Sequence, residues 1–319
     1  MGTAPRFVVG VDCGATSTKA TAFEVLGDGS LKPLARVVCG PSNPASTDRA
    51  VGQANIMECL RKLAEETGLR RFDLVAFSAA GTGHGAWRNY YVEAVLNTGL
   101  ADKVMVFEDY LVAHYACFEG GPGIVAISGT GSSAYGVGRG GTEVKVGGWG
   151  HLIDDGGSAW HAGKEGIKAA LKYLDGRGQY TSLLGRLVHY LGLRDLGDVI
   201  TKVYGDKAPK TLIAGFARYV VEEAIKGDDV AVNIIEEEAR EIAELLLAAR
   251  KMLNDNELPL CVVGGFYEGA GELLQPHLLK ELGNHGISKD SLVEASLSME
   301  EAAVKLSLSK ILVSSAVSP

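Results

Sequence analysis

The sequence has few of the residues that build disulfide or metal frameworks. Its 319 residues include five cysteines, which are scattered and never form a C-x-x-C pair. This pattern is typical of reduced thiols in a cytosol and argues against a disulfide framework, a zinc site or an iron–sulfur site. The seven histidines show no i, i+4 pair, so we expect structural or surface roles for them, including a loop-bracing role for His151.

Strong basic charge and long apolar segments are also missing. Asp and Glu outnumber Lys and Arg by 39 to 31, which gives a net charge of −8, and no run of five basic residues occurs. Such a surface repels nucleic acid and anionic lipid. No apolar stretch has the ~18 residues of a membrane span, and residues 1–11 lack the features of a signal peptide. We therefore expect a cytoplasmic protein that binds neither nucleic acid nor membranes.

Glycine, in contrast, is abundant. The chain has 42 glycines, about twice the usual share, and they cluster between apolar runs. Glycine at the ends of strands indicates tight turns, or places where the backbone comes close to a ligand.

The order of apolar runs and turns predicts two α/β halves. In the first half, three strands joined by glycine hairpins precede a helix–strand–helix–strand series, and the second half again opens with a strand, a Gly/Thr turn and a strand. We interpret this as an internal duplication of topology, not of sequence. The expected strands are 6–12, 18–26, 31–38, 72–78, 103–107, 123–128, 133–137, 143–146 and 258–263. The expected helices are 48–67, 87–96, 158–174, 180–191, 211–226, 230–253 and 299–313.

The first glycine-containing turn predicts a phosphate-binding loop. Small and hydroxyl residues here direct backbone N–H groups and side chains toward one point, which forms a nest for phosphate oxygens. Asp12, at the end of the strand, is suited to hold Mg²⁺ through water. A plain hairpin whose aspartate caps the turn fits this segment equally well. The candidate nucleotide-binding residues are Asp12, Gly14, Thr16, Ser17, Thr18 and Lys19.

Two further turns repeat this chemistry. The run 124–128 ends in Gly129, Thr130, Gly131 and Ser132, which form a second candidate phosphate-binding turn. Gly264 and Gly265 follow a third apolar run and would let the backbone approach adenine or ribose, although paired glycines also begin helices. Similar turns at equivalent places in both halves favour a shared role in enclosing a triphosphate.

These three turns resemble those of the sugar kinase, actin and heat-shock chaperone ATPase superfamily. Within it, the sequence is most similar to the N-acetylglucosamine kinase family and the related archaeal broad-specificity hexokinases. The stretch GGWGHLIDDGGSAW, residues 147–160, carries this resemblance most strongly. The resemblance implies two RNase H-like, actin/hexokinase-type α/β domains with mixed sheets flanked by helices and a cleft between them. We expect residues 1–113, completed by helix 298–319, to form one domain, and residues 114–297 to form the nucleotide-binding domain.

The resemblance also implies a reaction, namely Mg²⁺-dependent transfer of the γ-phosphoryl group of ATP to a hydroxyl of N-acetylglucosamine or a related hexose or hexosamine. It implies a homodimer as well. Asp109 is the implied general base, although an aspartate there is also a natural N-cap for a helix at 111–118. Asn43 and Asp155 are implied to bind sugar hydroxyls, but they could equally serve as a turn residue and a helix cap. The other candidate sugar contacts are Gly81, Gly148, Trp149 and Ser158.

The chain departs from this family's pattern around the expected sugar site. The family usually has Gly-Asp-Glu-Gly-Ser where this chain has residues 154–158, Asp-Asp-Gly-Gly-Ser, so that Gly156 replaces a glutamate. Glu108 stands where Asn or Asp is expected before the base, and Ser133 replaces an Asn that often follows the second turn. ATP is therefore a firmer expectation than the identity of the sugar.

Two other functions fit parts of the sequence. One is an ATPase that activates a partner enzyme, as the activators of 2-hydroxyacyl-CoA dehydratases do. Those activators bridge an iron–sulfur cluster with cysteines near the helix after the second turn, and this chain has no cysteine between Cys117 and Cys261. The other is a sugar sensor that binds its ligand without phosphoryl transfer. Such a sensor would not need Asp109.

Overall fold

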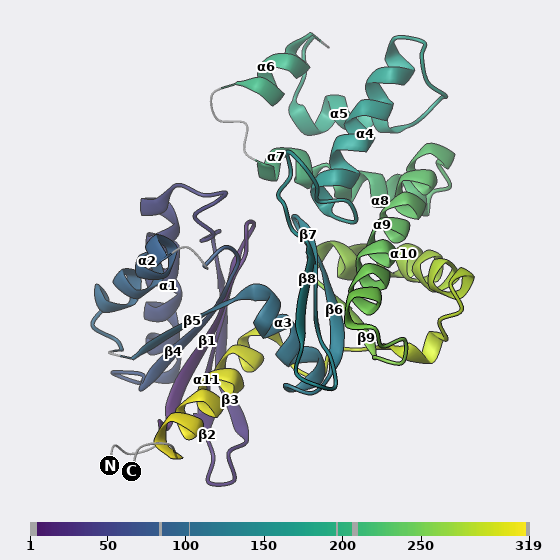
Figure 1. Ribbon diagram of the computed structural model, residues 1–319. Coiled ribbons are helices and arrows are strands. Elements are labelled where there is room, and N and C mark those ends of the chain that lie inside the picture. Colours follow the sequence, from purple (N-terminus) through teal and green to yellow (C-terminus); the bar gives the residue numbers. More distant parts are fainter. Residues whose placement is uncertain (1–4, 83–84, 102, 196, 206–209, 317–319) are drawn as a thin grey trace. The chain divides into compact units, whose positions relative to one another are not determined.

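The computed structural model describes residues 5–82, 85–101, 103–195, 197–205 and 210–316 (Figure 1). The chain divides into two compact units: unit 1, Met1–Gly120 with Ala295–Pro319, and unit 2, Gly121–Glu294. Each unit is a mixed five-stranded sheet flanked by helices, which confirms the α/β class expected from the sequence. Gly83 of the expected loop at 80–83 and residues 317–319 of the expected final segment lie outside the described residues.

Unit 1 is built on a sheet with the strand order β3-β2-β1-β4-β5. Its strands are β1 (Phe7–Cys13), β2 (Thr18–Val25), β3 (Leu31–Cys39), β4 (Leu74–Ala79) and β5 (Val104–Glu108). Its helices are α1 (Arg49–Thr67), α2 (Gly85–Leu96), α3 (Asp109–Phe118) and α11 (Met299–Ala316). The first three strands form an antiparallel meander, whereas β1, β4 and β5 run parallel, so their carboxyl ends meet at one edge.

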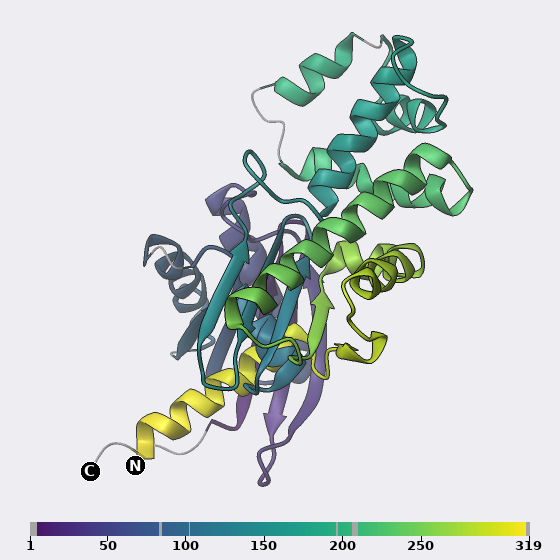
Figure 2. The same ribbon diagram turned by 45° about the vertical axis from the view of Figure 1, so that its right-hand side comes forward.

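Helices cover both faces of the unit 1 sheet. Helices α1 and α2 pack on one face around the buried rings of Phe77, Tyr90 and Tyr91. Helices α3 and α11 pack on the other face, and Figure 2 shows α11 (yellow) lying along these strands. Because β4 is covered on both sides, its six residues are all buried and read as a continuous apolar run. Edge strand β3, by contrast, is largely exposed and contains Pro33.

Unit 2 repeats this sheet with additional helices. Its strands are β6 (Gly123–Ser128), β7 (Ser132–Val137), β8 (Glu143–Gly147), β9 (Leu260–Val263) and β10 (Leu292–Val293). Its helices are α4 (Ala159–Leu174), α5 (Leu183–Leu191), α6 (Asp198–Tyr204), α7 (Lys210–Gly215), α8 (Ala217–Ile225), α9 (Asp229–Leu253), α10 (Gly265–Asn284) and the 3₁₀ turn η1 (Lys289–Ser291). Strands β6, β7 and β8 form an antiparallel meander, and β6, β9 and β10 run parallel.

The two sheets have the same topology. Counted from the meander, unit 1 runs 3-2-1-4-5 and unit 2 runs 8-7-6-9-10, so β6 corresponds to β1 and β9 to β4. This confirms the duplication predicted from the repeated strand–turn–strand pattern. The long helix α9 packs against β6, β7 and β8, and Figure 2 shows it (green) crossing these strands (teal).

The structure differs from the expected elements in several places. Helix α6 and the short strand β10 were not predicted. The helix expected at 211–226 is broken at Phe216 into α7 and α8, and the helix expected from 180 begins at Leu183. Helix α10 was not among the expected helices, although a helix start was one interpretation of Gly264 and Gly265, and this interpretation is confirmed. The helix carries four glycines and Pro276, which mask a regular stripe of buried side chains four residues apart. The stripe consists of Phe266, Ala270, Leu274, Leu278 and Leu282.

Candidate functional site

In unit 1, the predicted site residues gather at the carboxyl edge of the parallel strands. The register pairs Asp12 of β1 with Ser78 of β4, and Ala79 of β4 with Glu108 of β5. The backbone N–H of Gly81 donates to Glu108 Oε2 at 3.1 Å. The first predicted loop, the Gly81 loop and the Glu108–Asp109 pair therefore share one edge of one sheet.

The first loop is a tight turn between β1 and β2. Gly14 N–H donates to the carbonyl of Ser17 at 3.0 Å, and Lys19 Nζ lies 4.0 Å from Asp12 Oδ2. Thr16 is exposed at the tip and Ser17 is half-buried, so both are accessible to a ligand. Thr18 is fully buried, and its hydroxyl contacts the carbonyl of Gly40 and the hydroxyl of Ser42 instead. The Thr18 side chain thus holds the neighbouring loop.

That neighbouring loop contains Asn43. The backbone N–H groups of Ser42 and Asn43 point to the carbonyl of Gly14, at 3.3 and 3.4 Å. Asn43 Oδ1 accepts the N–H of Ala45 at 2.9 Å, which makes Asn43 a turn residue, as one reading of the sequence expected. The structure therefore brings a predicted sugar contact directly beside the predicted phosphate loop.

Asp109 begins helix α3. The residue preceding the helix is Glu108, which makes no side-chain capping bond, so Asp109 is the first helical residue and not the cap. Its Oδ1 accepts the N–H of Tyr110 at 2.9 Å. The carboxylate is half-buried at the edge described above, where the first turn of a helix stabilises negative charge.

In unit 2, the second and third predicted turns touch each other. The register pairs Ile127 of β6 with Val263 of β9, which places the following residues side by side. Gly264 has φ +118°, and a Cβ there would lie 2.5 Å from the carbonyl oxygen of Ser128 and 3.1 Å from the nitrogen of Gly129. Only glycine fits this contact. Gly265, the first residue of α10, has no neighbour within 4 Å of an added Cβ.

The second turn rests on the segment 155–160. Gly129 N–H donates to the carbonyl of Gly131 at 3.0 Å, which closes the turn. The carbonyls of Gly129 and Thr130 accept the N–H groups of Ala159 and Trp160, the first residues of α4, at 2.9 and 3.3 Å. The start of α4 therefore fixes the orientation of the turn.

Asp155 is the most constrained residue of this segment. It has φ +75°, a left-handed conformation that is uncommon outside glycine, and only 3% of its side chain is exposed. Its Oδ2 lies 2.5 Å from Lys210 Nζ, and its Oδ1 is 3.4 Å from the backbone nitrogen of Ser132. One carboxylate oxygen thus contacts the second turn and the other binds Lys210 of α7, and a contact to sugar stays a prediction. Lys210 was not foreseen, because a lone lysine 55 residues away carries no local signal.

Ser158 is the N-cap of α4 and is fully buried. Its hydroxyl accepts the N–H of His161 at 3.3 Å and donates to the carbonyl of Asp155 at 2.6 Å. Ser158, and not Asp155, is therefore the residue that caps this helix. The hydroxyl is used within unit 2, where it ties the segment to the helix.

The loop between β8 and α4 is exposed and apolar at its tip. Trp149, Leu152 and Ile153 are 75%, 87% and 83% exposed, and Gly148 has φ +72°. The Trp149 ring is thus accessible for stacking on a sugar. His151 packs edge-on against Trp160 with ring centroids 5.3 Å apart, in line with the loop-bracing role expected for it.

Gly156 faces a carboxylate from a distant helix. A Cβ on Gly156 would lie 2.2 Å from Oε2 of Glu241 in α9, whereas the backbone of Gly156 is not in the left-handed region. Glu241 therefore occupies the space that a side chain at 156 would need. Burial, followed by the charge of Glu244, raises the pKa of Glu241.

A glutamate at position 156 is therefore expected to be incompatible with Glu241. Overpacking and the second carboxylate should lower the free energy of unfolding of Gly156→Glu by about 1–3 kcal/mol, as thermal unfolding would measure. The double variant Gly156→Glu/Glu241→Ala should recover most of this loss, and Glu241→Ala alone is the control. An unchanged melting temperature for Gly156→Glu alone would show that Glu241 moves aside freely.

The side chains of the candidate site are better suited to a magnesium ion bound together with a nucleotide than to a metal ion held by the protein alone. Within the described ranges, no group of three or more His, Cys, Asp or Glu side chains is arranged to hold a metal ion. Mg²⁺ needs fewer, since it is commonly held by one or two carboxylates, water and the substrate's phosphates. Asp12, at the strand end beside the first turn, is a carboxylate of that kind.

None of the described helices is long and apolar enough to cross a membrane.

Two duplicated α/β units with glycine turns at the carboxyl ends of their parallel strands define a class of two-unit nucleotide-binding proteins. The family model of the BadF/BadG/BcrA/BcrD ATPase family matches residues 9–290, and the chain belongs to this family.

Curated relatives include two sugar kinases. The N-acetylmuramic acid/N-acetylglucosamine kinase of Clostridium acetobutylicum is 33% identical over 266 residues, which span 82% of this chain and 85% of the relative. The N-acetyl-D-glucosamine kinase of Dictyostelium discoideum is 30% identical over 51% of this chain and 53% of its own length.

Solved structures share the fold. A protein from Chromobacterium violaceum assigned as an N-acetylglucosamine kinase aligns with a TM-score of 0.75 and 22% identity, over 96% of this chain and 99% of that one. A ROK family glucokinase from Streptomyces griseus, solved with glucose and AMPPNP, aligns with a TM-score of 0.56 and 17% identity, over 94% and 97% of the two chains.

Proposed function

We propose that the protein is an ATP-dependent sugar kinase that transfers the γ-phosphoryl group of ATP to a hydroxyl of N-acetylglucosamine or a closely related amino sugar. The observation that carries this proposal is the packing of Gly264 against Ser128 and Gly129, which joins two predicted nucleotide-binding turns at one sheet edge. The activities named for the two curated relatives support the sugar as acceptor.

In this proposal, the candidate nucleotide-binding groups of each unit have their own role. In unit 2, the backbone of the Gly129–Ser132 turn binds phosphate oxygens, and the glycines after β9 let the nucleoside approach the backbone. In unit 1, the turn from Asp12 to Lys19 binds the phosphates, with Thr16 and Ser17 as accessible hydroxyl donors. Mg²⁺ bound with ATP would neutralise charge on the phosphates, and Asp12 is the residue we propose to hold it.

The acceptor hydroxyl is the proposed target of Asp109. Its carboxylate would accept the proton of the sugar hydroxyl as that oxygen attacks phosphorus, a contribution of about 10²–10⁴ in rate. Asn43 and Trp149 are the proposed sugar contacts, one through its side-chain amide and the other through its ring face. Fixed placement of sugar and phosphate by these loops supplies much of the remaining rate enhancement.

A coupled ADP-release assay tests the proposal directly. The purified full chain with ATP and Mg²⁺ is expected to release ADP in proportion to added N-acetylglucosamine, and more slowly with other acceptors. The acceptor panel should include N-acetylmuramic acid, N-acetylmannosamine, glucosamine, glucose and mannose. ATP binding without sugar-stimulated ADP release would overturn the kinase proposal, and sugar binding without any ADP release would indicate a sensor. Sedimentation of the same sample checks the homodimer, which we also propose.

A further inference from the structure

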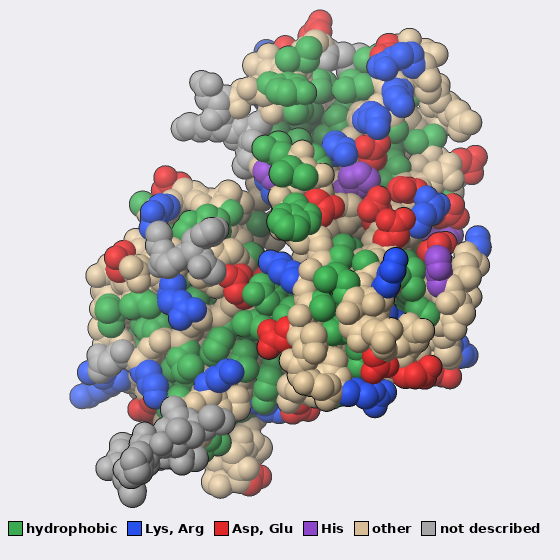
Figure 3. Space-filling model, viewed as in Figure 1, with side chains coloured by type: hydrophobic (Ala, Val, Ile, Leu, Met, Phe, Trp, Pro, Cys, Tyr) green, Lys and Arg blue, Asp and Glu red, His purple; other side chains and the backbone are tan. Residues whose placement is uncertain are grey.

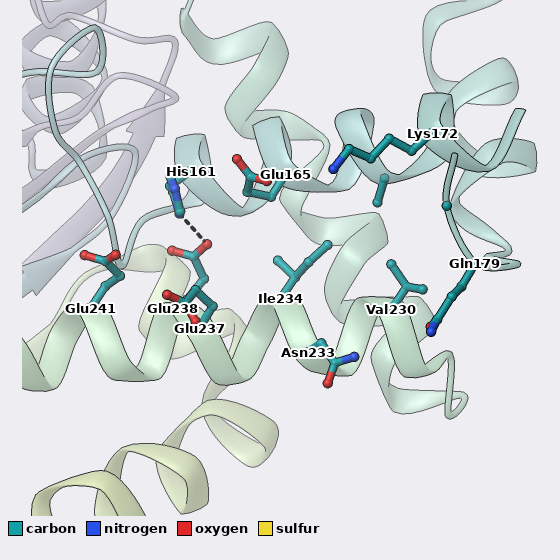
Figure 4. A pocket seen from close by; sticks show the side chains of 12 residues that line it. His161, Glu165, Lys172, Gln179, Val230, Asn233, Ile234, Glu237, Glu238 and Glu241 are labelled. Atoms are coloured by element: carbon teal, nitrogen blue, oxygen red, sulfur yellow. Dashed lines mark hydrogen bonds and ion pairs between the residues drawn. The ribbon is translucent and has the colours of Figure 1, made fainter. Parts of the chain in front are cut away.

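A histidine–glutamate pair in unit 2 contacts the segment that supports the second turn. His161 of α4 and Glu238 of α9 face each other, with 2.8 Å between His161 Nδ1 and Glu238 Oε1 (Figure 4). The Glu238 side chain is fully buried, and 18% of the His161 side chain is exposed. None of the catalytic or ligand-binding roles proposed above uses either residue.

The second oxygen of Glu238 holds the segment that supports the turn. Gly157 N–H donates to Glu238 Oε2 at 2.8 Å, across 81 residues of sequence. The carbonyl of Gly157 accepts the hydroxyl of Ser128 at 2.7 Å, and the carbonyl of Gly156 accepts the hydroxyl of Ser132. Ser128 and Ser132 flank the turn on either side. One buried carboxylate is thus two hydrogen bonds away from the end of β6.

We propose that Glu238 and His161 are positioning residues that hold the Gly129–Ser132 turn in its phosphate-binding geometry. The proposal rests on the proposed function, because it assumes that this turn binds the nucleotide. Glu238 is held from one side by the His161 ring, which fixes the direction of Oε2 toward Gly157. Without the His161 bond, the Glu238 carboxylate could turn away from Gly157, and the hydrogen bond that supports the Gly157–Ser128 contact would weaken.

Solvent reaches the pair through a pocket between α4 and α9. The pocket has a volume of about 520 Å³ and is lined near the pair by Glu165, Glu237 and Glu241. Figure 3 shows acidic side chains gathered over α4 and α9 on this face of unit 2. Because the His161 side chain lines this pocket and is partly exposed, its protonation can follow the pH of the solution.

The charge of the pair depends on its surroundings. The hydrogen bond to Glu238 raises the pKa of His161 above its ordinary value of 6.5, although burial opposes this. Burial raises the pKa of Glu238, although the bond to His161 opposes this. The other charged groups acting on the pair are Lys164, Glu165 and Glu241, and Glu241 is itself influenced by Glu244, Glu237 and Asp154.

The direction of the pH effect follows from these shifts. A raised histidine pKa stabilises the folded arrangement at low pH, and this contribution is lost as pH rises through the raised value. The affinity of the turn for ADP is therefore expected to weaken as pH rises. The variant Glu238→Gln should have the opposite pH dependence of ADP affinity. The glutamine amide can donate to neutral His161 while its oxygen still accepts Gly157 N–H. Protonated His161 would place its Nδ1–H against the N–H of the glutamine amide, so that two donors face each other. The affinity for ADP should then fall as pH falls.

The experiment compares ADP dissociation constants of the wild-type full chain and three variants, by calorimetry from about pH 6 to pH 8. Glu238→Ala should weaken ADP binding about tenfold, since it leaves Gly157 N–H without its acceptor. Glu238→Gln should bind nearly as well as the wild type at high pH, with the opposite pH slope. Glu237→Gln, one residue away on the same helix and paired with Arg240, is the matched control and should follow the wild type.

The outcomes separate the two proposals. Equal pH slopes in the wild type and Glu238→Gln would overturn the positioning role, and this holds even if Glu238→Ala does not fold. A merely structural role would lower the melting temperature and weaken binding to the same degree at every pH. If wild-type protein binds ADP with the predicted slopes but phosphorylates no sugar, the positioning role stands and the sugar kinase assignment falls.

Discussion

Asp109→Asn is expected to lower kcat for sugar phosphorylation by about 10²–10⁴. Asparagine has nearly the same shape and can still accept the N–H of Tyr110, as the aspartate side chain does. It cannot accept a proton from the sugar hydroxyl. The loss should therefore fall on kcat, whereas the KM for ATP and the melting temperature should stay close to the wild type. Steady-state kinetics with N-acetylglucosamine and ATP measure the effect.

Glu108 provides the comparison for this experiment. It precedes Asp109, lies at the same sheet edge and accepts Gly81 N–H through Oε2. Glu108→Gln keeps an acceptor for that bond, so its effect should be far smaller and should appear mainly in KM. If Glu108→Gln abolished turnover and Asp109→Asn did not, the general base would be Glu108. The glutamate found here in place of the family's Asn or Asp would then have a catalytic role.

Local patterns in the sequence were enough to predict the first sheet and four of the five strands of the second, and only the two-residue strand β10 was missed. Each strand of the two meanders is an apolar run closed by glycine, and this pattern survives without knowledge of any distant contact. The candidate phosphate-binding turns could be recognised for the same reason, since the chemistry of a turn lies in four or five consecutive residues. The body of helix α10 was missed because glycine and proline usually indicate the end of a helix, and it contains several glycines and Pro276. Its buried side chains nevertheless recur every four residues.

The distant residues that hold these turns in place could not be predicted from local patterns. Lys210 binds Asp155 from 55 residues away, and Glu238 binds Gly157 from 81 residues away. No local pattern around Lys210 or Glu238 indicates such a contact. The same is true of Glu241, whose carboxylate fills the space beside Gly156. In a helix such as α9, a run of glutamates is typical of a solvated face. Only the fold shows that some of them turn inward to a loop.

Gly264→Ala is expected to disrupt nucleotide binding in unit 2. The φ of +118° with ψ of 153° is open almost only to glycine, and this conformation alone costs an alanine about 1–3 kcal/mol. The new Cβ would also overlap the carbonyl oxygen of Ser128, an atom of the backbone that cannot rotate away. Relief requires β9 and the second turn to move apart, so ADP affinity should fall about tenfold or more, because 1.4 kcal/mol corresponds to a factor of ten.

Gly269→Ala is the matched control for this substitution. Gly269 lies farther along α10, and an added Cβ there meets no atom within 4 Å. Alanine inside a helix is favoured over glycine by up to about 1 kcal/mol, so this variant should be as stable as the wild type or slightly more stable. Calorimetric ADP titration and thermal unfolding of both variants decide the matter. Should Gly264→Ala bind ADP as tightly as Gly269→Ala, the contact between the ends of β6 and β9 would have no part in holding the nucleotide, and the observation that carries the kinase proposal would lose its meaning.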